Sequence, residues 1–190
     1  MRKLVLSLQV SPDGFCNHDT AVVGEDWMEY INDLTEQMDT ALFGRVTFEL
    51  FEQFWPAEAK ARKGPAQMTR FADLIDGMEK LIVSATLEDI GWRNSKVLPK
   101  LSKEVIDALK AKRGKDIIVF GGPQLISELI LLDAFDDYYI VIQPVLAAAG
   151  YRLFTDVKRD KVALELVETK AFKNGVIVLH YRPITTGVLI

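Results

Sequence analysis

The chain has 190 residues, carries a net charge of −4 at pH 7, and is 49% hydrophobic and 26% charged. This length and balance suit one globular domain with a sizeable core and exclude a disordered chain, which would have too little apolar surface to bury. The basic residues are scattered, which argues against nucleic acid as a partner. The single cysteine, Cys16, has no internal disulfide partner and predicts a reducing, cytoplasmic location.

The first ten residues have the outline of a signal peptide, with a charged start followed by a short apolar run. The run contains Ser7 and Gln9, and no small-residue cleavage pattern follows it. It is therefore interpreted as a strand. No part of the sequence approaches the ~20 apolar residues of a membrane span, so we expect no membrane association.

Strands and helices alternate along most of the chain, as judged by apolar runs and by helical spacing of apolar residues. In the first half of the chain we predict a strand at Leu4–Val10, a helix at 26–38, a strand at 40–43, and helices at 46–54 and 68–78. The second half continues with strands at 80–84 and near 97–98, a helix from 102, a strand at 116–120, a helix to about 132 and a strand at 138–145. Trp55-Pro56 is expected to end the second helix, and residues 57–67 to form a loop.

The chain closes with the clearest hairpin in the sequence. Strands at 161–169 and 176–182 flank the turn Lys173-Asn174-Gly175, and Asn-Gly favours a tight hairpin turn. The whole pattern predicts an α/β fold with a mostly parallel central sheet, antiparallel C-terminal edge strands and helices on both faces. We expect one domain over residues 1–183 and a tail over 184–190, with ligands outside the carboxyl ends of the parallel strands.

Two predicted strands end in glycine and turn directly into helices, at Gly44 and at Gly121-Gly122. Glycine lets the backbone approach a bound group closely, and a helix start offers unpaired N–H donors, so both junctions suit phosphate. Arg45 and Thr47 would add side-chain donors. Tight packing alone would also explain such glycines, and the G-x-G-x-x-G fingerprint of the common dinucleotide fold is absent.

A third strand end carries two hydroxyls, on Ser84 and Thr86. Two or three phosphate-binding strand ends in one small sheet would suit a dinucleotide, which has several phosphates. Metal chemistry has little support, because His18 and His180 are far apart in the sequence and lack neighbours with ligand spacing.

At these junctions the sequence resembles the dihydrofolate reductase superfamily, and within it the RibD C-terminal-domain branch, the reductase domain of riboflavin biosynthesis. The similar segments keep their order from about residue 2 to 183; they are 11–15 (SPDGF), 44–49 (GRVTFE), 55–56 (WP), 80–84 (KLIVS), 92–95 (WRNS), 119–122 (VFGG), 144–146 (PVL) and 150–154 (GYRLF).

The resemblance implies a dihydrofolate-reductase-like three-layer fold, NADPH as cofactor and a homodimer. It also implies cofactor contacts by position. Gly44, Arg45 and Thr47 would lie at the pyrophosphate and 2′-phosphate, and Ser84 and Thr86 at the adenine ribose phosphate. The second phosphate junction would comprise Gly121, Gly122, Gln124 and Leu125, and residues 6–8 with 13–15, including Leu6 and Gly14, would lie beside the nicotinamide.

The sequence departs from folate reductases at two positions. Their first helix carries an early acidic residue that supports proton delivery, but the ungapped match here is Met28. Asp26 is the first candidate proton donor and Asp13 the second, although a helix start and a turn explain these residues equally well. Gln124 stands where a basic residue is common.

The leading hypothesis is therefore an NADPH-dependent reductase that transfers hydride to a C=N or C=O carbon of a heterocyclic or sugar-derived small molecule. The resemblance implies an activity like reduction of 5-amino-6-(5-phosphoribosylamino)uracil. The alternatives are pterin reduction of the dihydrofolate reductase type and a dimeric protein that binds NADPH without catalysis.

Overall fold

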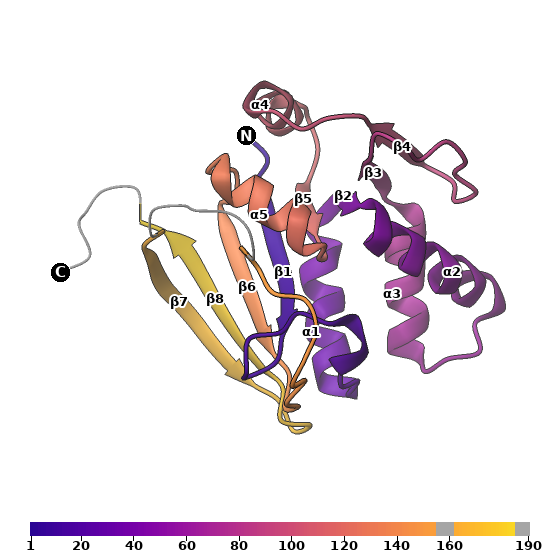
Figure 1. The fold of residues 1–190 in the computed structure, drawn as a ribbon. Coiled ribbons are helices and arrows are strands. Elements are labelled where there is room, and N and C mark those ends of the chain that lie inside the picture. The colour runs from indigo at the N-terminus through magenta and orange to yellow at the C-terminus, as the bar shows by residue number, and fades with distance from the viewer. Residues whose placement is uncertain (155–161, 185–190) are drawn as a thin grey trace.

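In a computed structural model of the chain, which describes residues 1–154 and 162–184, the described residues form a sheet with strand order β4-β3-β2-β5-β1-β6-β8-β7 (Figure 1). The strands are β1 (Leu4–Val10), β2 (Met38–Gly44), β3 (Glu79–Val83), β4 (Ser95–Leu98), β5 (Asp116–Val119), β6 (Asp137–Ile142), β7 (Leu164–Ala171) and β8 (Ile177–Pro183). The helices are α1 (Glu25–Glu36), α2 (Arg45–Ala61), α3 (Ala66–Gly77), α4 (Lys103–Ala111) and α5 (Pro123–Leu131), with a short 3-10 turn η1 (His18–Thr20).

The sheet is mixed, as the sequence predicts. Strands β1 to β6 pair in parallel, whereas β8 pairs antiparallel with β6 and β7 antiparallel with β8. The predicted Asn-Gly turn connects β7 to β8, and Gly175 adopts the positive φ of 88° that this turn requires. The predicted start of this hairpin, Lys161, lies outside the described residues, as do positions 185–190 of the predicted tail.

Helices cover both faces of the sheet and give two apolar cores. Along β1, Val5 belongs to the core beneath α1, α2 and α3, whereas Leu4 and Leu6 belong to the core beneath α4 and α5. This split follows from the alternation of side chains along a strand. The central strands are apolar on both faces because both faces are covered, which is the pattern of a parallel sheet.

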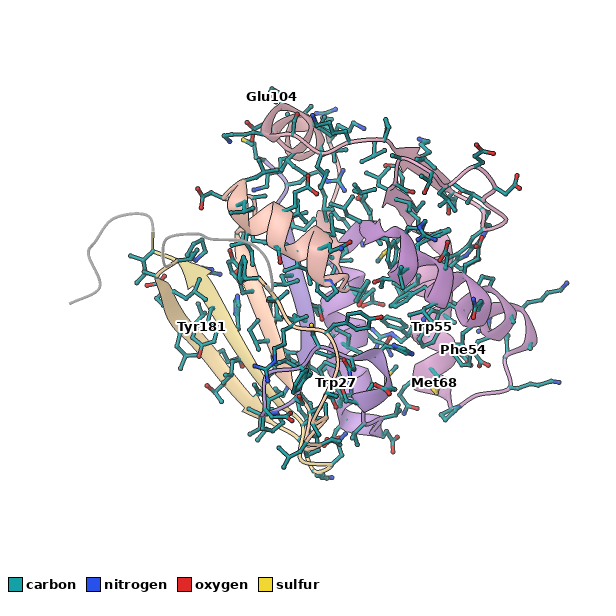
Figure 2. The ribbon with its side chains drawn as sticks, in the orientation of Figure 1. Trp27, Phe54, Trp55, Met68, Glu104 and Tyr181 are labelled. Atoms are coloured by element: carbon teal, nitrogen blue, oxygen red, sulfur yellow. The ribbon has the colours of Figure 1, made fainter. Side chains whose placement is uncertain are left out.

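The prediction that Trp55-Pro56 ends the second helix is wrong. Helix α2 continues through Pro56 and ends where Arg62 takes a left-handed conformation, φ 51°. Proline removes one backbone donor, but Trp55 lies between α2 and α3 and packs edge-on against Phe71 with ring centroids 4.8 Å apart (Figure 2). Tertiary packing therefore outweighs a local helix-breaking signal, and part of the predicted loop at 57–67 is helical.

The other errors concern element ends. The first helix ends at Glu36, before residue 38, because β2 begins at Met38. The strand predicted to reach residue 145 ends at Ile142. Helix α4 begins where the sequence predicts: Ser102 is its N-cap residue, and its hydroxyl accepts a hydrogen bond from the Val105 N–H at 3.3 Å.

A buried lysine closes the C-terminal end of α3. Lys80, the second residue of β3, is fully buried, and its Nζ donates to the carbonyl oxygens of Ile75 at 3.0 Å, Asp76 at 3.1 Å and Met78 at 2.9 Å. The ammonium also lies 4.4 Å from the centroid of the Trp92 ring. A cation thus meets carbonyl groups at the negative end of the helix dipole. Burial lowers the pKa of Lys80 to about 8.

We predict that Lys80→Met lowers the free energy of unfolding by about 1–3 kcal/mol at neutral pH, because buried carbonyl oxygens lose their donor. The pKa of Lys80 in the folded protein, about 8, lies below the ordinary value of 10.5. Between pH 8 and 10.5 the unfolded chain therefore keeps the Lys80 proton that the folded protein has lost. Native stability should therefore rise relative to the variant from pH 8 to 10.5. Urea unfolding across this range measures both effects, with Lys96→Met at an exposed position as control; parallel pH curves would contradict the assignment.

Candidate functional site

The carboxyl ends of β1, β5 and β2 lie side by side, and the chain leaves them toward opposite faces. Strands β1 and β2 continue into α1 and α2, whose apolar residues share one core, whereas β5 continues into α5, which packs on the other face. Because β5 lies between β2 and β1, the connections separate on both sides of its end. Such a separation is where open α/β sheets form their ligand crevice.

The two glycine junctions meet at these strand ends, which we call the candidate crevice. A Cβ atom placed on Gly122 would lie 3.8 Å from the Gly44 Cα and 3.4 Å from the Thr47 Oγ1. One placed on Gly44 would lie 3.6 Å from the Leu125 Cβ, and one on Gly121 would lie 3.8 Å from the Thr47 Cγ2. The structure therefore brings together five of the predicted cofactor-binding residues, from two segments far apart in the sequence.

The starts of α2 and α5 both face this point without a side-chain cap. Gly44 and Gly122 occupy the N-cap positions, and neither helix start has a side-chain capping hydrogen bond from the described residues. First-turn N–H groups of two helices, together with their dipoles, make such an edge attractive to anions. Gly122 has φ 86° and Gly121 φ 134°, a backbone that residues with side chains rarely adopt. These glycines serve the tight turn at which the two helix starts come together.

Arg45 and Gln124 lie in the first turns of these two helices. Arg45 is half-exposed, and its Nη1 lies 3.0 Å from the Glu49 Oε1 one turn along α2. Gln124 is exposed at the start of α5. Both side chains therefore stand at the rim of the crevice, and the charge of Arg45 is partly compensated by Glu49.

Ser84 has a local role that the sequence analysis did not include. Its Oγ accepts hydrogen bonds from the N–H groups of Thr86 at 3.2 Å and Leu87 at 3.0 Å, which stabilises the turn after β3. Strand β3 neighbours β2, so this turn lies at the same edge of the sheet as Gly44. Contact of Ser84 or Thr86 with a cofactor phosphate stays a prediction.

The loops that follow β1 and β6 are interlocked, and we call residues 11–17 and 147–152 the clasp. The Asp13 carboxylate accepts hydrogen bonds from the N–H groups of Ala147 at 3.2 Å and Ala148 at 2.8 Å. Asn17 donates to the Ala149 carbonyl oxygen at 2.9 Å and accepts from the Tyr151 N–H at 2.9 Å. The Ser11 side-chain hydrogen bond and these amides lower the pKa of Asp13 to about 2.

Asp13 is thus held as an anion that joins two loops, which favours a structural role over proton delivery. Arg152 completes the clasp: its guanidinium lies 4.1 Å from the Phe15 ring centroid, and its Nη2 donates to the Asp13 carbonyl oxygen at 3.2 Å. Gly14, with φ 86°, lies between these residues. Arg152 was absent from the predicted site, although it belongs to a segment that carries the family resemblance.

Asp26 and Leu6 have other surroundings. Asp26 lies in the first turn of α1, where Oδ1 accepts from the Trp27 N–H at 3.0 Å and Oδ2 from the Lys173 N–H at 3.2 Å. It thereby joins α1 to the β7–β8 turn, and its role as proton donor stays a prediction. Leu6 is 1% exposed and packs in the core beneath α4 and α5. Its predicted position beside the nicotinamide stays a prediction.

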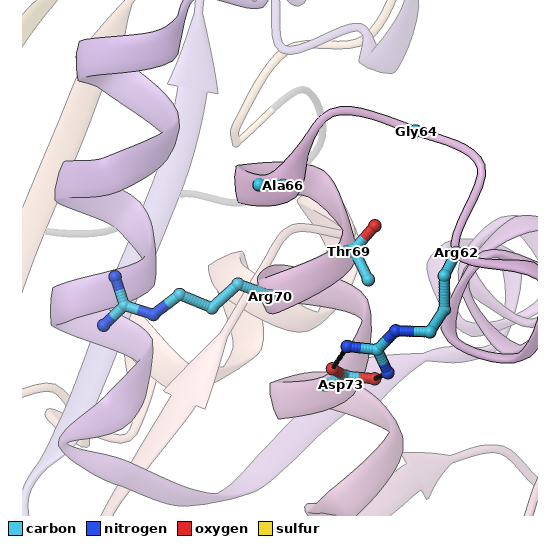
Figure 3. Close-up of a pocket in the computed structure, with 6 residues that line it drawn as sticks. All are labelled: Arg62, Gly64, Ala66, Thr69, Arg70 and Asp73. Carbon is cyan, nitrogen blue, oxygen red and sulfur yellow. Dashed lines mark hydrogen bonds and ion pairs between the residues drawn. The ribbon is translucent and has the colours of Figure 1, made fainter.

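A second hollow, between the end of α2 and α3, is a poor candidate (Figure 3). It is lined by Arg62, Gly64, Ala66, Thr69, Arg70 and Asp73. Arg62 pairs with Asp73 at 3.0 Å, and Arg70 pairs with Asp33 and Glu36, each at 2.9 Å. Both arginines are therefore already compensated, and the lining residues offer no excess charge to attract an anion.

Two other kinds of site were sought in the described part of the chain. Within residues 1–154 and 162–184, no group of three or more His, Cys, Asp or Glu side chains is arranged to hold a metal ion. Over the same residues, none of the helices has the length and apolar character needed to cross a bilayer.

The mixed sheet, its two helical layers and the crevice at β5 define an α/β protein of the dihydrofolate-reductase-like fold. The RibD C-terminal domain model matches residues 2–178, and the chain belongs to this family. The protein YyaP of Bacillus subtilis (strain 168) is 31% identical over 189 residues, which cover 95% of this chain and 94% of YyaP.

Two solved structures share the fold. A pyrimidine reductase-like protein from Corynebacterium diphtheriae has a TM-score of 0.67 at 15% identity, with 97% of this chain and 93% of that chain covered. A diaminohydroxyphosphoribosylaminopyrimidine deaminase/5-amino-6-(5-phosphoribosylamino)uracil reductase from Thermotoga maritima has a TM-score of 0.68 at 13% identity. The match covers 96% of this chain but 57% of the Thermotoga chain.

We predict that Gly122→Ala destabilises the protein by about 1–3 kcal/mol, because φ 86° is strained for alanine and the added methyl group would meet Thr47. Gly77→Ala is the matched control. Gly77 ends α3, and no neighbouring atom of the described residues lies within 4 Å of the position that an added methyl group would take. Alanine also favours a helix, so this change should be neutral or stabilising. Thermal and urea unfolding of both variants test the pair; equal stability would contradict a constrained junction.

Proposed function

We propose that the protein is an NADPH-dependent reductase that transfers hydride to a C=N or C=O carbon of a heterocyclic or sugar-derived small molecule. The observation that carries the proposal is the meeting of the α2 and α5 starts at Gly44 and Gly122, where a Cβ on Gly122 would come within 3.8 Å of the Gly44 Cα. Two uncapped helix starts at one glycine-lined crevice fit the pyrophosphate of a dinucleotide. Membership of the RibD C-terminal family supports a reductase.

The proposal assigns each part of the cofactor to residues at the candidate crevice. The first-turn N–H groups of α2 and α5 would hold the pyrophosphate, and Arg45 at the rim would meet the 2′-phosphate. The clasp, with Gly14 and Phe15, would close over the nicotinamide end. NADPH supplies the hydride when bound; the chain orients it and limits the access of water.

The substrate is proposed as a heterocyclic or sugar-derived small molecule. The name of the Thermotoga protein includes a 5-amino-6-(5-phosphoribosylamino)uracil reductase, and this reaction is the specific activity that we propose to test first. Asp26 is the candidate proton donor, since Asp13 is held as an anion with a pKa of about 2. The engagement of both carboxylates with backbone N–H groups favours, as a second candidate, an NADPH-binding protein without catalysis.

We predict micromolar binding of NADPH and weaker binding of NADH, measured by tryptophan quenching and energy transfer. Arg45→Ala should weaken NADPH much more than NADH, because a charge-assisted contact with the 2′-phosphate is lost. Glu49→Gln should tighten NADPH, because it releases Arg45 from its ion pair. Arg62→Ala, which breaks a remote pair with Asp73, is the control and should change neither affinity.

The outcomes separate the possible roles of this site. If Arg45→Ala lowers the affinities for NADPH and NADH equally, Arg45 is instead assigned to the pyrophosphate, which both nucleotides share. If neither nucleotide binds the native protein up to millimolar concentration, the reductase proposal fails. Consumption of NADPH with a panel of carbonyl, imine and pyrimidine substrates then distinguishes an enzyme from a protein that only binds the cofactor.

We also propose a cytoplasmic homodimer, assembled through the β7–β8 edge of the sheet. In Figure 1, β8 and β7 form the edge farthest from α2 and α3. Leu166 on β7 is 55% exposed and pairs with Tyr181, and Ile177 is 37% exposed on the same side of β8. Leu146 and Tyr151, in the loop after β6, are also exposed. A second copy would cover such apolar side chains.

We predict that Leu166→Glu converts the dimer to a monomer, because the introduced carboxylate would be buried unpaired at the interface. Val23→Glu, at a position that is 60% exposed before α1, is the control and should leave the dimer intact. Sedimentation velocity of the native protein and both variants provides the measurement. A monomeric native protein, or dissociation by the control alone, would exclude this edge as the interface.

A further inference from the structure

A fully buried glutamine lies just beyond the end of β6 with a fixed orientation. Gln143 is 0% exposed, and its Oε1 accepts a hydrogen bond from the Val22 N–H at 2.9 Å. A backbone N–H can only donate, so the oxygen of this side-chain amide, and not its nitrogen, must face Val22. The Gln143 N–H also donates to the Val10 carbonyl oxygen at 2.9 Å, which ties the residue to the end of β1. The position and the polarity of this amide are therefore both set by the backbone.

The orientation of Gln143 determines that of Gln9. With its oxygen toward Val22, Gln143 turns its Nε2 toward Gln9, and it donates to the Gln9 Oε1 at 3.4 Å. Gln9 must present an acceptor to this donor, so its oxygen faces Gln143 and its own NH2 group is directed elsewhere. The backbone N–H of Val22 thus fixes the polarity of two successive amides.

Gln9 lies at the carboxyl end of β1, on the side that faces α1 to α3. It alternates in phase with Val5, which packs in that core, and it is half-buried. Directly after the neighbouring strand β5, Phe120 precedes Gly121 and packs against the same core, with its ring centroid 5.6 Å from that of Phe51. An amide at the end of β1, on the face of the sheet that carries this aromatic cluster, is suited to a planar ring with a polar edge.

We propose that Gln9 is a specificity-determining residue whose NH2 group donates a hydrogen bond to an acceptor, such as a ring carbonyl, on the bound heterocycle. Gln143 is the positioning residue that holds Gln9 in this orientation. The inference rests on the proposed function and adds the polarity of the substrate edge to it. A ligand with an amino group at this position would place a second donor opposite the Gln9 NH2 group. Neither donor would then have an acceptor, so such a ligand binds less tightly.

The first test measures orientation without any ligand. Once its carboxyl group is ionised, Gln143→Glu places an acceptor-only carboxylate opposite Gln9, so Gln9 should rotate and donate its NH2 to position 143. Because burial raises the pKa of a carboxyl group, the variant is compared with the native protein across a pH series. In 15N-resolved NMR spectra, the Gln9 side-chain protons should then exchange with water more slowly than in the native protein. Gln53→Glu, at an exposed position on α2, is the control and should leave them unchanged. Unchanged Gln9 exchange in the Gln143→Glu variant would overturn the proposed relay.

The second test measures selectivity with uracil and cytosine, which share a ring but differ by a carbonyl or an amino group at C4. In the presence of saturating NADPH, the native protein should favour uracil by about tenfold, the effect of one mismatched hydrogen bond. Gln143→Glu should reverse or abolish the preference, and Gln143→Met, which leaves Gln9 free to rotate without adding a charge, should reduce it. Chemical-shift titration gives both affinities.

NADPH affinity, measured on the same samples, separates the possible failures. If the native protein does not bind NADPH, the proposed function itself is wrong. If the native protein binds NADPH, three results would overturn the role of Gln9 alone. These are equal affinity for uracil and cytosine, no pyrimidine binding up to the solubility limit, and a selectivity that Gln143→Glu leaves unchanged. Retained NADPH affinity in the variants shows that they are folded.

Discussion

The position of β5 between β1 and β2 is the constraint on which the candidate site depends. Its neighbours leave the sheet toward α1 and α2, whereas β5 must leave toward α5 on the other face. The chain makes this exit through Gly121 and Gly122, both with positive φ. Because Gly122 has a φ of 86°, which residues with side chains rarely adopt, this tight turn between the starts of two helices requires glycine. Topology and residue choice together produce a crevice between two helix starts.

Features encoded by neighbouring residues could be predicted from the sequence. The Asn-Gly turn, the Ser102 cap and the glycine junctions are set by local backbone requirements, so their positions agree with the structure. The continuation of α2 through Pro56 could not be predicted in this way. It depends on packing of Trp55 against Phe71, which is a contact between two helices. Local preference is a weak guide wherever a distant partner supplies more energy than the preference costs.

The roles of polar side chains were the hardest to predict, because many of them bind backbone groups from remote segments. The Asp13 carboxylate accepts hydrogen bonds from the N–H groups of residues 147 and 148, and the Glu52 carboxylate accepts hydrogen bonds from those of Gly91 and Trp92. Lys80 satisfies carbonyl oxygens at the end of α3. In each case the sequence shows a charge, but its partner is a main-chain group that carries no sequence signal. The same reason explains why Gln143 was absent from the predicted site.

Three groups proposed to meet the ligands are hydrogen-bond donors. The starts of α2 and α5 present N–H groups, Arg45 stands at their rim, and the proposed orientation of Gln9 adds an NH2 group. Hydride addition to a C=O or C=N carbon moves an electron pair onto the oxygen or nitrogen, where negative charge develops. Donors fixed in advance around such an atom stabilise that charge more than they stabilise the neutral ground state. In the proposed function the helix starts and Arg45 would hold the cofactor phosphates, so the Gln9 NH2 group is the donor that would meet this charge, while the carboxylates of Asp13 and Asp26 hold the backbone.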